Sequence, residues 1–235
     1  MKTCLSLAGF RKGAYVAALS FAFCFMPCGT QTASATSLQT SPESGHKTDV
    51  QPVSLHPGNA LTQSIRTPAL FGTAEARSAD NSAFTKFNRA VARLNDKTAP
   101  LPRELAMLKD APLLAKVEAV NTHYNKVRYI EDKNNYGTSD YWAMPVEFTR
   151  VGGDCEDYVL AKYAALKELG VSEDKLRMVI LQDTLKNLPH AILVVYTADG
   201  AKFLDNQFKT VKDVDGFTRY APIYSINRTG WWRHT

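Results

Sequence analysis

From residue 81 onward, apolar residues first follow a helical spacing and then, in the second half, a strand spacing. The helical pattern predicts an amphipathic helix from residue 84 to about 96, with Phe84, Phe87, Val91 and Leu94 on one face. Pro100 and Pro102 end it. Two more helices are predicted, from 103 to about 108 and from 112 to about 129.

The pattern changes after a long polar segment. Residues 131–153 predict one long loop, of the length that often has a function. A helix is then predicted from 154 to 169, and it is apolar nearly all round, which is typical of a buried helix. Extended runs follow at 175–182, 190–197, 201–205 and 221–228. Helices followed by consecutive antiparallel strands predict an α+β domain.

The N-terminal residues differ in composition from this domain. Basic residues, a short apolar run and an Ala-Ser-Ala pattern predict a cleaved secretory signal over residues 1–35. The apolar run is shorter than the roughly 20 residues of a membrane span, although an uncleaved anchor stays an alternative. Residues 36–80 are rich in Ser, Thr, Gln, Pro and Gly and predict a disordered linker. The folded domain is therefore expected at 81–235.

Loss of the signal would change the charge and the cysteine content. It would remove three basic residues and no acidic one, so the formal net charge would fall from +5 to +2, too weak to indicate nucleic-acid binding. It would also remove three of the four cysteines and leave Cys155. A lone thiol in an oxidising compartment is expected to be either buried or used.

Cys155 has the position of an activated nucleophile. It follows Gly152, Gly153 and Asp154 at the predicted start of a helix, where the helix dipole favours a thiolate. A base and an orienting group are then needed. His190 begins one strand and Asp205 closes the next strand of the same hairpin, so the turn would bring them together. The alternative is that Cys155 is only a small buried hydrophobe.

The motif around Cys155, together with two others, supports a family resemblance. Gly153-Asp154-Cys155-Glu156-Asp157-Tyr158, Leu188-Pro189-His190-Ala191 and Leu204-Asp205-Asn206 resemble motifs of the bacterial transglutaminase-like cysteine proteinases, among them the LapG-type periplasmic proteases. The resemblance implies a papain-like or transglutaminase-like fold, with N-terminal helices and a buried central helix packed on an antiparallel sheet. It implies peptide cleavage through an acyl-enzyme, with Cys155 as nucleophile, His190 as general base and acid, and Asp205 orienting the imidazole.

The resemblance also implies a cofactor, a location and partners. LapG-type members bind calcium through the acids beside the cysteine, here Asp154 and Glu156. They act in the periplasm, release biofilm cells by clipping a large surface adhesin, and are sequestered by an inner-membrane cyclic-di-GMP receptor. Two other functions stay open: a transglutaminase or amidase with the same triad, and a binding protein that keeps the fold without chemistry.

The acids next to Cys155 have two interpretations. Asp154 and Glu156 could be an ordinary helix cap and first-turn acid. They could also hold Ca²⁺, which needs six to eight oxygen ligands, with the rest drawn from Asn134, Asn135, Ser139 and Asp140 in the predicted loop. Acids beside a cysteine raise the pKa of its thiol, and a bound cation would relieve that effect.

Overall fold

The computed structural model describes residues 69–96, 100–138 and 140–235. The predicted signal peptide, 1–35, and most of the predicted linker lie outside the described residues. Of the four cysteines only Cys155 is described, and it is a free thiol. No described helix combines the length and the apolar character needed to cross a bilayer.

The described chain forms a seven-stranded sheet in the order β1-β7-β6-β2-β3-β4-β5, and every pairing is antiparallel. The strands are β1 (Glu75–Ser78), β2 (Leu176–Asp183), β3 (Leu188–Thr197), β4 (Gly200–Leu204), β5 (Lys212–Asp213), β6 (Tyr220–Asn227) and β7 (Gly230–His234). Strand β3 lies inside the sheet and is buried on both faces, which explains its nearly unbroken apolar run.

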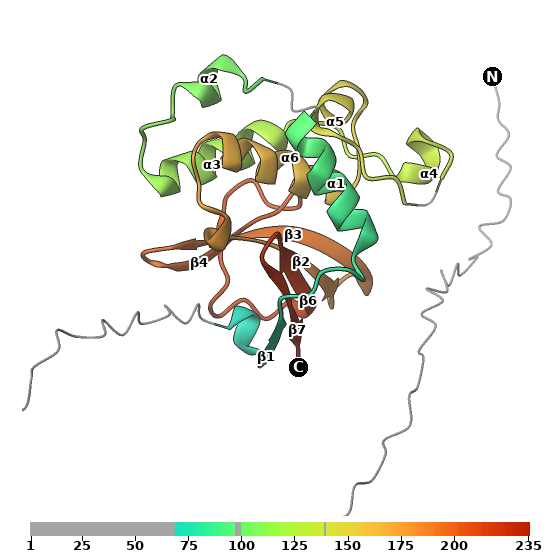
Figure 1. The fold of residues 1–235 in the computed structure, drawn as a ribbon, viewed down its shortest axis with the longest axis vertical. Helices are drawn as coiled ribbons and strands as arrows, with labels where there is room; N and C mark the ends of the chain where they lie inside the picture. The colour runs from blue at the N-terminus through green and yellow to red at the C-terminus, as the bar shows by residue number, and fades with distance from the viewer. Residues whose placement is uncertain (1–68, 97–99, 139) are drawn as a thin grey trace, which may run out of the picture. The chain divides into compact units, whose positions relative to one another are not determined.

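The helices gather on one side of the sheet (Figure 1). They are α1 (Thr85–Asp96), α2 (Arg103–Ala106), α3 (Leu113–Tyr124), α4 (Asp132–Asn135), α5 (Pro145–Val151) and α6 (Cys155–Glu168), with short 3-10 turns at η1 (Leu70–Gly72) and η2 (Glu173–Lys175). Ten residues of α6 are buried, so this helix is the centre of the layer and packs against α3 and β3. The predicted α+β class and the buried central helix are confirmed.

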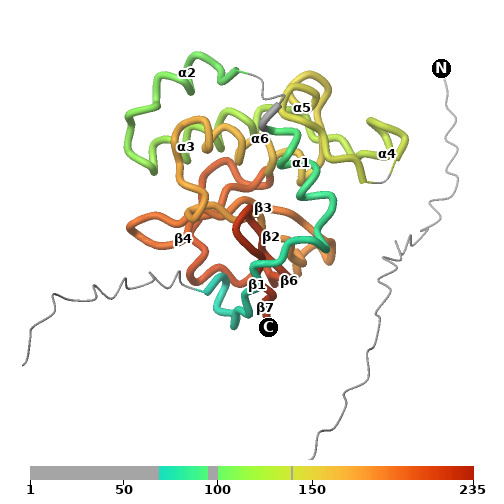
Figure 2. Tube along the Cα trace, viewed as in Figure 1, coloured from blue at the N-terminus to red at the C-terminus, as the bar shows by residue number. Residues whose placement is uncertain are grey.

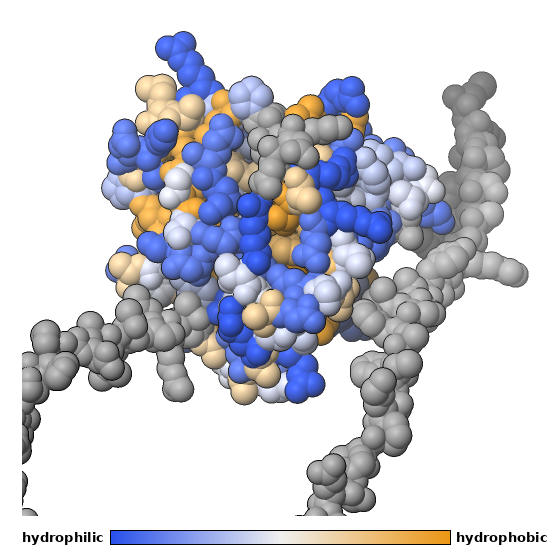
Figure 3. Space-filling model, viewed as in Figure 1, coloured by the Kyte–Doolittle hydropathy of each residue, from blue (hydrophilic) through white to orange (hydrophobic). Residues whose placement is uncertain are grey.

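Alternate residues of the central strands supply two apolar cores. On β3, Leu193 and Val195 face the helices, whereas Ile192 and Val194 face the opposite side of the sheet. That opposite side is covered by η1 and by aromatic residues around Phe203 and Phe217. The outer surface in the view of Figure 3 is mostly hydrophilic, and apolar residues gather there over α2 and α3.

The fold begins earlier than the sequence pattern predicts. Strand β1 lies within the predicted linker, yet it pairs with β7 over the register Glu75↔His234 to Ser78↔Trp231. Figure 2 shows this segment beside the C-terminal strand. Glu75 also pairs with the buried Arg177 at 2.9 Å. The domain boundary expected at residue 81 was therefore wrong, because a four-residue edge strand has too little periodicity to be seen in sequence.

The predicted loop 131–153 is also more structured than expected. It contains α4 and α5, and α5 begins at Pro145, a residue that suits a first helical position. The Glu147 carboxylate accepts a hydrogen bond from the Met144 N–H at 2.8 Å and so caps α5. In contrast, α3 ends at Tyr124, five residues before its predicted end.

Candidate active site

Helix α6 begins where two glycines allow a close approach of chain segments. Gly152 has φ +90°, a backbone conformation that favours glycine, and a Cβ there would lie 2.4 Å from the carbonyl oxygen of Arg128. A Cβ on Gly153 would lie 2.1 Å from the Asp157 carboxylate. That carboxylate accepts hydrogen bonds from the N–H groups of Ala143 (2.7 Å) and Asp154 (3.2 Å). Asp157 thereby fixes the segment that carries Cys155.

His190 and Asp205 meet at one end of the neighbouring strands β3 and β4. His190 lies on β3, and Asp205 follows the last residue of β4. The His190 Nε2 atom and the Asp205 Oδ1 atom are 2.9 Å apart, and both side chains are buried. With a carboxylate as the acceptor, Nε2 carries the proton and Nδ1 is left with its lone pair. The hairpin spacing in the sequence therefore identified two residues that the fold brings together.

The Asp205 carboxylate is held on both oxygens. Tyr220 donates its hydroxyl to Oδ2, and the N–H of Gln207 donates to Oδ1 at 2.8 Å. Burial would raise the pKa of Asp205, but the hydrogen bonds from His190, Tyr220 and Gln207 outweigh it and lower the pKa overall. Asp205 is thus an ionised, oriented partner for the imidazole. Tyr220 gave no signal in the sequence because it lies on β6, far from the motifs.

The Cys155 sulfur lies beside the backbone N–H of Ala191, the residue after His190. Its thiol donates a hydrogen bond to the Glu156 Oε2 atom at 2.9 Å. Burial raises the pKa of Cys155 well above its usual value, the charges of Glu156 and Asp154 add to this, and the Ala191 N–H acts in the opposite direction. The surroundings of Cys155 therefore oppose the effect of the helix dipole on the pKa of its thiol.

Three carboxylates converge at this helix start. One ligand oxygen from each of Asp132, Asp154 and Asp157 lies within 4.8 Å of the others, and Asp154, Cys155 and Glu156 form a second such group. Burial, followed by the charge of Glu156, raises the pKa of Asp154 to about 9. Burial also raises the pKa of Asp157 to about 8. Like charges are therefore crowded together in a poorly solvated place.

Two oxygens of this cluster are buried without a hydrogen-bond partner, Oδ1 of Asp154 and Oδ1 of Asp132. Orphaned buried oxygens are uncommon and are the donor type that a hard cation takes. Asp132, which the unexpected helix α4 brings to this cluster, was not among the ligands expected from the sequence.

The other loop residues considered as calcium ligands lie differently. Asn135 donates its side-chain amide to the Gly152 carbonyl at 3.1 Å. Asp140 pairs with Lys86 and accepts a hydrogen bond from the Trp142 indole. Ser139 lies outside the described residues.

Polar side chains of α6 and of the C-terminal part of α3 lie next to the loop that carries Asp205. Lys162 is only 1% exposed, and its Nζ atom donates to the Asn121 Oδ1 atom at 2.9 Å. One turn further along α3, the Asn125 amide donates to the carbonyls of Asp205 and Phe208, both at 2.8 Å. Asn125 thus holds the loop of Asp205 in place. Burial lowers the pKa of Lys162 to about 7, although the negative charge of Asp205 raises it.

Trp142 and Gln182, two side chains that could serve as oxyanion donors, make other hydrogen bonds. The Trp142 indole N–H donates to Asp140 at 3.0 Å, and the Gln182 amide donates to Asn187 at 3.1 Å. The backbone N–H of Cys155, at the start of α6, is a further candidate for an oxyanion donor.

A thiol at a buried helix start, next to a paired histidine and aspartate on an antiparallel sheet, is the arrangement of a papain-like or transglutaminase-like cysteine protease. A family model described as bacterial transglutaminase-like cysteine proteinase matches residues 77–234. The chain belongs to this family and is a cysteine protease.

A solved structure of a related protein agrees with this assignment. LapG of Legionella pneumophila, in an EGTA-treated form, is 27% identical to the chain, with a TM-score of 0.50; the match covers 63% of this chain and 85% of that one. A calcium-bound form of the same protein is 28% identical, with a TM-score of 0.49, over 62% of this chain and 86% of that one. No curated protein gave a match.

Proposed function

We propose that the chain is an exported endopeptidase with a Cys155–His190–Asp205 triad. The observation that carries the proposal is the 2.9 Å contact between His190 and Asp205, formed where the sulfur of Cys155 lies beside the Ala191 N–H. The three residue types match the nucleophile, the base and the orienting group that acyl transfer requires.

In the proposed mechanism the His190 imidazole accepts and returns one proton in each half of the reaction, acylation and deacylation. Nδ1 of His190 accepts the thiol proton as the sulfur attacks the peptide carbonyl carbon. The same proton passes to the leaving amine as the C–N bond breaks, which leaves a thioester on Cys155. Water then attacks the thioester carbonyl carbon and gives a proton to His190. The C–S bond breaks, the acid is released and the proton returns from His190 to the sulfur of Cys155, and Asp205 stabilises the imidazolium throughout.

The acidic cluster fits a calcium ion. Asp154, Glu156 and Asp132 would hold it, since they offer crowded carboxylates and two buried oxygens without partners. When bound, the ion would supply positive charge that offsets the repulsion among these acids and their effect on the neighbouring thiol. Family resemblance to LapG-type proteases supports the same cofactor.

The location, substrate and partner are proposed from that resemblance. We place the enzyme in the periplasm, reached through the predicted signal at residues 1–35. Its proposed substrate is a large cell-surface adhesin, whose cleavage would release cells from a biofilm. An inner-membrane receptor for cyclic-di-GMP is the proposed partner that sequesters the enzyme.

The triad is tested with Cys155→Ala. We expect this variant to lose cleavage of a protein substrate, by at least about 10⁴-fold, because the nucleophile is absent. Its thermal unfolding should match that of the wild type, since Ala is a small apolar replacement. Cleavage at the wild-type rate would contradict the triad, and an unchanged unfolding curve is the control for the fold.

Transamidation is separated from hydrolysis by the acyl acceptor. A dansyl-labelled amine is offered together with a glutamine-containing protein. Hydrolysis predicts shorter fragments without the label, whereas incorporation of the label without fragments would favour a transglutaminase.

Calcium binding is tested by calorimetry, independently of activity. We expect Asp154→Asn to weaken calcium binding by more than about tenfold, because it removes a ligand charge from the cluster. The control is Glu118→Gln, which makes the same charge change at an exposed position on α3. Equal calcium affinities for the two variants would exclude Asp154 as a ligand.

A further inference from the structure

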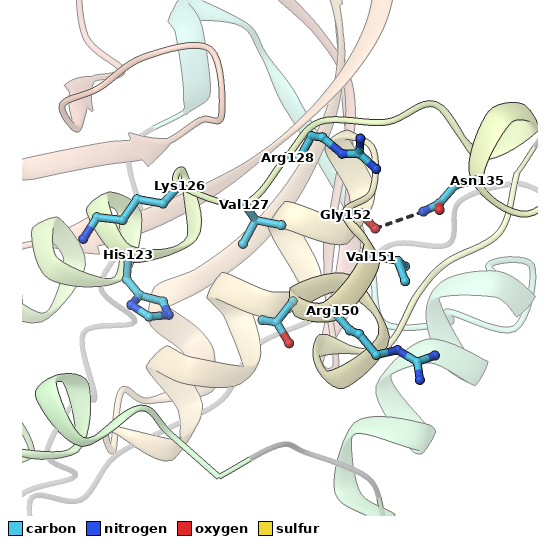
Figure 4. Close-up of a pocket in the computed structure, with 9 residues that line it drawn as sticks. His123, Lys126, Val127, Arg128, Asn135, Arg150, Val151 and Gly152 are labelled. Atoms are coloured by element: carbon cyan, nitrogen blue, oxygen red, sulfur yellow. Dashed lines mark hydrogen bonds between the residues drawn. The ribbon is translucent and has the colours of Figure 1, made fainter.

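A basic pocket lies on the other side of the segment that carries Cys155. It has a volume of about 750 Å³, and its polar lining comes from His123, Lys126, Arg128, Asn135, Thr149 and Arg150. No acidic residue lines it. Figure 4 shows His123 and Lys126 at one end, with Arg128 and Arg150 toward the other. We call this group of six residues the basic pocket.

The cations of the basic pocket are not neutralised by their surroundings. Within the described ranges, Lys126, Arg128 and Arg150 form no ion pair, whereas His123 pairs with Glu104 at 3.2 Å. All three side chains are exposed. Three unpaired positive charges around one opening favour an anionic ligand.

The basic pocket is coupled to the active site through one short stretch of backbone. The backbone of Gly152 lines the pocket, and Gly152 lies three residues before Cys155. The Gly153 N–H donates to the Arg128 carbonyl at 3.3 Å, and Tyr129 and Gly153 form a parallel bridge. The Tyr129 ring stacks on the ring of Tyr158, with the ring centres 6.5 Å apart, so this stretch also contacts the helix that begins at Cys155.

The two sides of the stretch carry different ionisable groups. Asp132, Asp154 and Glu156 lie on the catalytic side, and Lys126, Arg128 and Arg150 lie on the pocket side. An acidic segment is attracted to the second side. A protein chain that lies across both would therefore place its acidic residues in the pocket and a less acidic segment at the sulfur.

We propose that the basic pocket is an exosite for an acidic segment of the protein substrate, next to the bond that is cleaved. This inference rests on the proposed function, in which Cys155 cleaves a protein chain. A peptide fits better than a single small anion because the cations are spread around an open pocket of this volume.

The test measures binding of a fluorescein-labelled oligoglutamate peptide by fluorescence anisotropy. The full chain with Cys155→Ala is used, so that the probe is not cut. Arg128→Glu combined with Arg150→Glu should weaken binding of the peptide by about tenfold or more. In the chain that keeps both arginines, added NaCl should weaken binding. Lys175→Glu combined with Lys209→Glu makes the same charge change at exposed positions outside the pocket and should leave binding unchanged.

Three outcomes would overturn the exosite. They are equal binding by the two double variants, equal binding of an oligoglutamine peptide, and displacement of oligoglutamate by low concentrations of inorganic phosphate, which would indicate a small-anion site. Arg128→Gln combined with Arg150→Gln replaces the glutamate pair if that variant does not fold.

The proposed function is measured separately, by the rate at which iodoacetamide alkylates Cys155 in the chain that retains it. The arginine variants should react at the wild-type rate. A wild-type rate no faster than that of a free thiol would count against the triad and would leave the anisotropy result as evidence about the pocket alone.

Discussion

At the scale of single residues, Lys162 is the clearest conflict between burial and charge. Its ammonium group is 1% exposed, hydrogen-bonds only to Asn121 among the contacts described, and lies 5.6 Å from the centre of the Tyr158 ring. Asp205 is the acid whose charge reaches it. A buried cation behind Asp205, the proposed orienting residue, is destabilising for the fold, yet it adds positive charge where Asp205 must stay ionised.

The stability of the chain should therefore depend on pH through Lys162. Its pKa is about 7 in the folded chain and 10.5 in the unfolded one, so between these values the unfolded chain holds a proton that the folded chain has released. Raising the pH through this window stabilises the wild type. Below pH 7 Lys162 is protonated in both states, and the full free-energy cost of burying its charge applies. Lys162→Met should be more stable than the wild type below pH 7, by an amount that shrinks toward pH 10.5.

Urea unfolding at a series of pH values measures this difference. Lys175→Met is the control, because Lys175 is exposed and should show no such trend. A difference between Lys162→Met and the wild type that stays constant across the pH range would contradict the assignment.

At the scale of elements, the start of α6 depends on a glycine for space. Gly153→Ala would press a methyl group against the Asp157 carboxylate, which holds the N–H groups of Ala143 and Asp154. We expect a loss of about 2–4 kcal/mol in the free energy of unfolding, from overpacking and the weakened hydrogen bonds. Activity should fall as well, since Cys155 begins this helix.

Thermal and urea unfolding measure the effect, with Gly137→Ala as the comparison. Gly137 has φ +70° and no atom within 4 Å of the position of a Cβ, so its substitution reports backbone strain alone. If the two variants lost equal stability, the contact with Asp157 would not be the cause.

At the scale of the whole molecule, the edge strand β1 closes the sheet. A chain that starts at residue 81 lacks β1 and the Glu75 carboxylate that pairs with Arg177, which is 2% exposed. We expect it to be about 3–5 kcal/mol less stable than a chain that starts at residue 69, mainly because the buried Arg177 loses its ion pair with Glu75.

Urea unfolding of the two chains tests this expectation, and Glu75→Gln in the longer chain separates the charge from the strand. Equal stabilities for the chains starting at 69 and 81 would show that the fold does not need β1. A full loss in Glu75→Gln would assign the effect to the ion pair.

The sequence was enough to predict the fold class and part of the candidate active site. Continuous apolar runs fixed α6 and β3 as buried elements, because a periodic pattern reports which faces meet the core. The catalytic candidates could be predicted because Cys155, His190 and Asp205 lie at the ends of helices or strands, within short motifs. Asp132 was not predicted, since it lies in a segment whose pattern indicates a loop. Lys162 and Asn125 were not predicted either, since the helical pattern around them indicates only packing.

By itself, then, the sequence determined the helices-then-strands order, the family and the residues expected to do the chemistry, because these depend on local patterns. Only the tertiary structure decided what surrounds them. It joined β1 to β7, brought Asp132 to Asp154, placed Lys162 behind Asp205 and left three cations around one pocket. These features depend on contacts between segments distant in the chain, and no local pattern of polar and apolar residues records such contacts.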